Sequence, residues 1–196
     1  MNKLGYFKLS ALYSGLAALP PVLQLLVQPL IEGNGKLDAV DFSQIGMAEQ
    51  VTALAFTLVL FSMSAALTRF YYDVEDDQEQ YNKMVSGTLL SILFRGFLVA
   101  VIAWLLQDWI GAIFSQSALQ NFGEYGLLAI GIGVNRAVYM SATALYRNEK
   151  KIGAFVAANI GLALLRSAFQ VFAVLYWDMS FLGYLYGSFI GSTLVT

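Results

Sequence analysis

Long apolar stretches, each of about 20 residues and separated by short polar connections, dominate the pattern of the chain. A helix that crosses a bilayer needs about 20 mostly apolar residues, whereas a strand of a membrane barrel needs about ten of alternating polarity. These stretches do not alternate strictly, so the pattern predicts an all-α, polytopic membrane protein. We expect a six-helix transmembrane bundle with spans at about residues 8–31, 42–67, 85–106, 124–146, 152–176 and 181–196.

Composition supports an integral membrane protein. Hydrophobic residues make up 58% of the 196 residues and charged residues 12%, and the mean hydropathy is +0.65. The chain contains neither cysteine nor histidine, which excludes disulfides, thiol nucleophiles, imidazole catalysis and histidine-ligated metals. We therefore expect no catalytic residue, no cofactor and no metal site. We also expect no soluble domain and no nucleic-acid partner.

Basic residues outside the spans predict the orientation. With the N-terminus in the cytoplasm, only Lys36 falls in the opposite loops, and the cytoplasmic segments carry Lys3, Lys8, Arg69, Lys83, Arg147, Lys150 and Lys151. Cytoplasmic loops of membrane proteins are enriched in lysine and arginine. The pattern thus predicts a multi-pass protein with a cytoplasmic N-terminus.

Three arginines lie near the middle of otherwise uncharged spans: Arg95, Arg136 and Arg166. Each lies about 15 Å from the end of its span, which is half the thickness of a bilayer core. An arginine at that depth costs roughly 2.5–3.5 kcal/mol on insertion scales, so charges kept there usually serve a function. We expect a cationic, water-accessible cavity, and arginine favours phosphate or pyrophosphate because its planar fork makes paired hydrogen bonds.

Polar residues accompany these arginines and extend the predicted binding site. Asn135 precedes Arg136, and Asn159 and Gln170 lie at helical spacing from Arg166. Gln24 follows the proline pair in the first span. The alternative is that the arginines pair with carboxylates and only hold helices together, but Glu49 and Glu124 are the sole candidates within or beside the spans.

Prolines and glycines indicate how the helices move and pack. Pro20 and Pro21 lie inside the first span and predict a kink or break, which in transporters often marks a moving or binding segment. A static kink explains them equally well. Glycines recur every four residues in the last span, at Gly183, Gly187 and Gly191, and predict close helix packing.

An acidic run follows the second span, with Asp73, Glu75, Asp76 and Asp77 close together. Membrane prenyl- and phosphotransferases hold magnesium against a diphosphate with such carboxylates, because hard cations prefer oxygen ligands. A solvated loop explains the same run. A membrane-embedded transferase using Asp73 to Asp77 is therefore an alternative function.

Short motifs resemble a known family. The opening from Asn2-Lys3-Leu4 to Leu12-Tyr13-Ser14, the segment Ala65-Ala66-Leu67-Thr68-Arg69-Phe70-Tyr71, and Leu145-Tyr146-Arg147-Asn148-Glu149-Lys150-Lys151 look like the polysaccharide flippases. These are the Wzx-like, O-antigen branch of the multidrug/oligosaccharidyl-lipid/polysaccharide exporter superfamily. Arg69 matches the arginine that ends the second span of the family.

The resemblance implies a flippase that moves an undecaprenyl-pyrophosphate-linked oligosaccharide across the bacterial inner membrane by alternating access. Members contain two lobes, so residues 1–196 resemble a single N-terminal lobe of a longer protein. The implied partners are the lipid-linked oligosaccharide, membrane lipids, and a second lobe or a second copy. A multidrug exporter of the same superfamily is the other alternative, although its usual cationic substrates would be repelled by the arginines.

Overall fold

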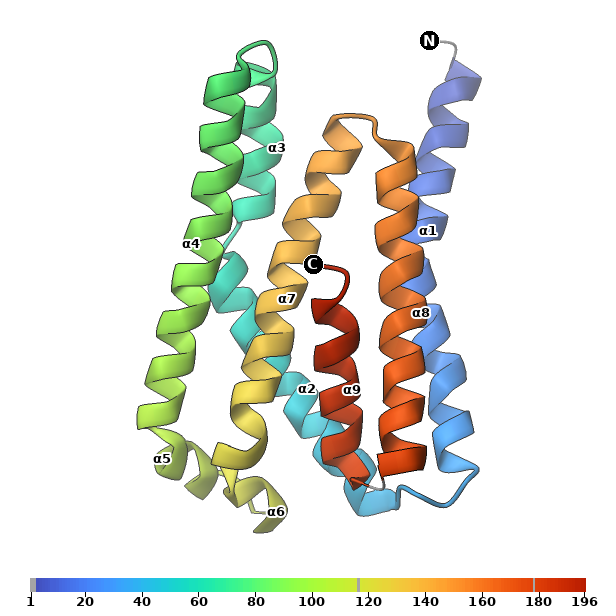
Figure 1. Cartoon of the computed structure of the whole chain (residues 1–196), viewed down its shortest axis with the longest axis vertical. Helices are drawn as coiled ribbons and strands as arrows, with labels where there is room; N and C mark the ends of the chain where they lie inside the picture. Colours follow the sequence, from blue (N-terminus) through green and yellow to red (C-terminus); the bar gives the residue numbers. More distant parts are fainter. Residues whose placement is uncertain (1–2, 116, 178) are drawn as a thin grey trace.

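The computed structural model describes residues 3–115, 117–177 and 179–196, and all regular structure in them is helical (Figure 1). The all-α prediction is confirmed. The helices are α1 (Lys3–Glu32), α2 (Ala39–Leu60), α3 (Met63–Val74), α4 (Gln78–Leu105), α5 (Gln107–Ala112), α6 (Ser117–Gln120), α7 (Phe122–Asn148), α8 (Ile152–Trp177) and α9 (Ser180–Thr193).

Five helical segments of the described chain are long and apolar enough to cross a membrane, which supports a multi-pass membrane protein. They are Ser10–Glu32, Ala39–Val74, Gln78–Leu105, Phe122–Asn148 and Ile152–Trp177. The sixth predicted span forms only the 14-residue helix α9. At 1.5 Å per residue it is about 21 Å long, shorter than a bilayer core of about 30 Å. The described residues thus contain five candidate spans and one shorter helix, and the sixth span stays a prediction.

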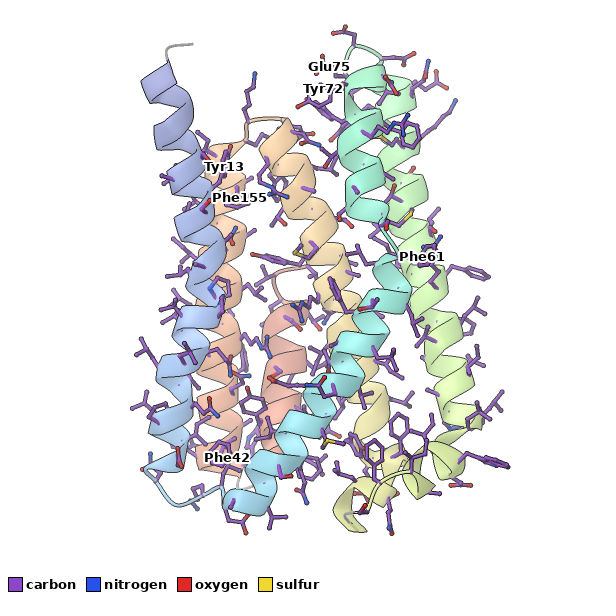
Figure 2. All side chains as sticks on the ribbon, turned by 180° about the vertical axis from the view of Figure 1, so that it is seen from behind. Tyr13, Phe42, Phe61, Tyr72, Glu75 and Phe155 are labelled. Carbon is purple, nitrogen blue, oxygen red and sulfur yellow. The ribbon has the colours of Figure 1, made fainter. Side chains whose placement is uncertain are left out.

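The helical break lies in the second span and not in the first. Helix α1 continues through Pro20 and Pro21, so the predicted break is absent there, and the predicted kink stays a prediction. The second span instead divides at Phe61 and Ser62, whose φ angles of 32° and 64° are left-handed. An L-residue in that conformation ends an α-helix. The predicted span 42–67 is therefore two helices, α2 and α3, and Figure 2 shows Phe61 at their junction.

Two groups of helices meet along α7. Helices α3 and α4 form a hairpin on one side, α1 lies on the other, and α7, α9 and α8 lie between them (Figure 1). Helix α2 crosses obliquely behind and packs on α7, whereas α1 packs on α8. In Figure 2, which views the molecule from behind, α1 and α2 lean apart and leave α8 and α9 visible between them.

Helices α8 and α9 pack closely through the predicted glycines. A Cβ atom on Gly187 would lie 2.5 Å from the Phe169 carbonyl oxygen, and one on Gly191 would lie 2.5 Å from the Arg166 Cα. Only glycine allows the two backbones to come so close. This contact fixes the depth at which Arg166 lies beside α9.

At one end of the bundle lie the start of α1, the α3–α4 turn and the α7–α8 turn (Figure 1). There the Tyr81 hydroxyl of α4 donates a hydrogen bond to Glu149, and Lys151 forms an ion pair of 3.0 Å with the same carboxylate. These contacts tie the α3–α4 hairpin to the α7–α8 turn.

Candidate functional site

A cavity of about 500 Å³ is lined by residues of α1, α2, α7, α8 and α9. Its volume lies in the range of small-molecule binding sites. The cavity is lined by Ala17, Pro20, Pro21, Gln24, Glu49, Gln50, Thr52, Ala53, Ile132, Asn135, Arg136, Tyr139, Met140, Leu162, Arg166, Ser192 and Thr196. Polar side chains thus come from every helix that surrounds it. A polar surface in a membrane-spanning region requires water, a ligand or another protein segment to cover it.

Two of the predicted arginines share this cavity. Arg136 comes from α7, and its guanidinium carbon lies 4.6 Å from the centre of the Phe56 ring on α2. No carboxylate of the described chain forms an ion pair with Arg136. A cation above an aromatic face is stabilised without giving up its hydrogen-bond donors. Arg136 can therefore still receive an anion.

Arg166 comes from α8 and faces a carboxylate. Its Nη2 lies 3.8 Å from Oε1 of Glu49 on α2, and its Nε is buried without a hydrogen-bond partner. The pairing with Glu49 is the one that the alternative interpretation of the sequence anticipated. One carboxylate accompanies two arginines in the lining, so the cavity keeps a net positive charge.

Hydrogen bonds join Glu49 to two further helices. The Tyr184 hydroxyl of α9 donates to Glu49 Oε1 over 3.4 Å, and Gln24 Nε2 of α1 donates to the Tyr184 oxygen. Tyr184 is almost completely buried. The chain from Gln24 to Glu49 therefore crosses from α1 through α9 to α2 along one wall of the cavity.

Asn135 lies in the cavity lining and holds α9 in place. Its Nδ2 donates to the Ser192 hydroxyl over 3.0 Å and to the Thr193 hydroxyl over 2.8 Å. The predicted set Arg136, Arg166, Asn135 and Gln24 thus occupies a single cavity.

Arg95 lies elsewhere. It belongs to α4, and its guanidinium carbon lies 5.7 Å from the centre of the Phe61 ring at the α2–α3 break. Its Nη1 is buried without a hydrogen-bond partner. Arg95 therefore does not line this cavity with the other two arginines, because α4 lies across α7 from α8 (Figure 1).

The other two predicted polar residues are buried in helix contacts outside the cavity lining. Asn159 accepts a hydrogen bond from the Tyr139 hydroxyl at 2.8 Å and donates to the Phe155 carbonyl at 2.7 Å. Gln170 donates to the Ser188 hydroxyl at 2.6 Å. Both residues therefore connect helices. Asn159 also orients Tyr139, which does line the cavity.

The remaining predicted residues lie on the surface. Arg69 is exposed on α3, and the acidic run is exposed around the α3–α4 turn, with Glu75 labelled at that end in Figure 2. Asp77 caps α4 by accepting hydrogen bonds from the backbone N–H groups of Glu79 and Gln80. Among the described residues, no three acidic side chains are placed to hold a metal ion.

Phe56, Gln50 and Tyr184 belong to the site, yet sequence reasoning did not select them. Gln50 had a detectable signal, because a second polar residue beside Glu49 interrupts an apolar span. Phe56 and Tyr184 had none, since aromatic residues recur throughout the chain.

Comparison of the chain with known proteins identifies no relative. It matches no family model, no curated protein and no solved structure. The function is therefore inferred from the cavity, its charges and the residue patterns of the chain.

Proposed function

We propose that this chain is part of a transporter that moves a lipid-linked, pyrophosphate-bearing oligosaccharide across the bacterial inner membrane by alternating access. The observation that carries the proposal is the pair Arg136 and Arg166 in one cavity with a single carboxylate. Arginine forks bind phosphate oxygens through paired, charge-assisted hydrogen bonds. Two such forks suit a pyrophosphate.

The position of the cavity suits a ligand with a lipid tail. Its lining includes residues of α1 and α2, which lean apart in Figure 2, and neutral polar side chains such as Gln50 and Asn135 line its wall. In our proposal the pyrophosphate binds the arginines, the sugars contact the polar wall, and the lipid tail passes between α1 and α2. A second lobe or a second copy covers the open side of the cavity.

The two alternative functions receive less support. The cavity has a net positive charge, which repels the cationic substrates of a multidrug exporter. The acidic run from Asp73 to Asp77 is exposed beside the α3–α4 turn and lies outside the cavity lining, so a transferase site there would not use the arginines.

A flipping assay tests the proposal. The protein is reconstituted into proteoliposomes with a fluorescent undecaprenyl-pyrophosphate oligosaccharide, and loss of the outer-leaflet label is followed. We expect Arg136→Ala together with Arg166→Ala to abolish flipping. Arg147→Ala is the matched control, because Arg147 lies on α7 but is exposed outside the cavity. Wild-type rates in the double variant, or equal loss in the control, would overturn the proposal.

A further inference from the structure

The contact between Arg166 and Glu49 balances charge without using the hydrogen bonds of the arginine. The Nη2 to Oε1 distance of 3.8 Å exceeds the 2.7–3.2 Å of a protein hydrogen bond. Arg166 Nε is buried and has no hydrogen-bond partner. A buried donor without a partner costs free energy, and a ligand oxygen that reached it would recover that cost. The arginine is therefore neutralised but still open to a ligand.

Glu49 is held loosely enough to move. Its side chain is 48% exposed, and its hydrogen bond from the Tyr184 hydroxyl is long, at 3.4 Å. In a water-filled cavity a half-exposed carboxylate can rotate away with little loss, whereas leaving Arg166 unpaired in the membrane would cost more. These conditions favour exchange of one anion for another on Arg166.

We propose that Glu49 is a built-in competitor that occupies Arg166 until the anionic ligand displaces it. This inference rests on the proposed function, since it requires that Arg166 binds the anion. The tethered carboxylate is present at high effective concentration, so it excludes abundant small anions such as chloride. A pyrophosphate displaces it because it brings more negative charge and more acceptor oxygens to the two arginines. Glu49 thus determines which anions enter the site.

Calorimetry with inorganic pyrophosphate on the purified full chain in detergent tests this role. Glu49→Gln keeps the shape of the side chain and the oxygen that accepts from Tyr184. We expect it to bind pyrophosphate about tenfold tighter than wild type, within the range of typical coupling between competing ligands. It should also make pyrophosphate binding sensitive to chloride, whereas we expect binding by wild type to be insensitive to it. Glu124→Gln, an exposed carboxylate outside the cavity lining, should change neither property.

A double variant that moves the carboxylate separates the effect of its contact with Arg166 from the effect of its charge on the cavity. Glu49→Gln combined with Gln50→Glu keeps the charge of the cavity but shifts the carboxylate by one residue. We expect the pyrophosphate affinity of the double variant to stay within about threefold of that of Glu49→Gln. The reason is that the affinity depends on whether a carboxylate occupies Arg166. Return to wild-type affinity would overturn the inference, as would unchanged or weaker binding in Glu49→Gln.

The same titration separates the two proposals. If Arg166→Ala weakens pyrophosphate binding while Glu49→Gln does not tighten it, the anion site stands and the competitor role fails. If neither wild type nor any variant binds pyrophosphate, the anion site of the proposed function fails, and the competitor role fails with it.

Discussion

The guanidinium of Arg136 lies over the ring of Phe56, with 4.6 Å between the guanidinium carbon and the ring centre. This contact joins α7 to α2 beside the cavity that Arg136 lines. An aromatic face stabilises the cation without accepting its hydrogen bonds, so the N–H groups stay available. Arg166 differs, because its charge is balanced by Glu49. The two arginines of the cavity are thus positioned by unlike partners.

Removing the ring should weaken the site. In Phe56→Leu the side chain stays apolar, but Arg136 loses a cation–π contact of about 0.5–2 kcal/mol. We expect the protein to unfold at lower temperature and to bind pyrophosphate about threefold more weakly, because ordering the free arginine costs entropy. Calorimetry and thermal unfolding in detergent measure both effects. Phe56→Tyr, which retains the ring face, should behave like wild type; equal weakening in it would exclude the ring as the cause.

Gly187→Ala should destabilise the contact between α8 and α9. The added Cβ would lie 2.5 Å from the Phe169 carbonyl oxygen and 2.6 Å from the Gln170 Cα, and backbone atoms cannot move aside cheaply. Overpacking of this kind costs about 1–3 kcal/mol. Gly87→Ala on α4 is the control, since nothing lies within 4 Å of its added Cβ. Thermal unfolding should separate the two variants, and equal stability would contradict the close contact.

Ser62→Gly should stabilise the protein. Ser62 has a φ of 64° and its side chain makes no capping hydrogen bond, so the variant loses no contact of that kind. A non-glycine residue in the left-handed region costs roughly 1–2 kcal/mol, and we expect about 1 kcal/mol of that to be recovered. Ser64→Gly, in the right-handed helix α3, should instead destabilise by up to about 1 kcal/mol. A lower unfolding temperature for Ser62→Gly would show that the break is not strained.

Asp77 should make stability depend on pH. Backbone hydrogen bonds, first that from Gln80, hold the pKa of this exposed carboxyl below its ordinary value. Its stabilising effect is therefore present above the ordinary carboxyl pKa and is lost as pH falls through the lowered one. Unfolding temperatures measured from about pH 5 to 2 should fall less in Asp77→Asn than in wild type. An equal fall in wild type and Asp77→Asn would contradict this prediction.

Much of the fold was predictable because hydrophobic length is a local property. The fourth and fifth predicted spans lie within α7 and α8, and the third, 85–106, ends one residue beyond α4. The break was placed wrongly, since proline chemistry indicated Pro20 and Pro21 and the left-handed residues are Phe61 and Ser62. Neither of those two has a strong preference for that conformation, so no sequence signal marked it.

The sequence by itself determined an all-α chain of membrane-spanning length, the glycine stripe of α9 and three arginines at mid-span. Tertiary structure decided which of those arginines act together. Arg136 and Arg166 meet in one cavity because α7 and α8 both border α9, whereas Arg95 lies on α4, across α7. The depth of a charge within its span is a local property of the sequence, but its partners depend on how each helix is rotated and packed.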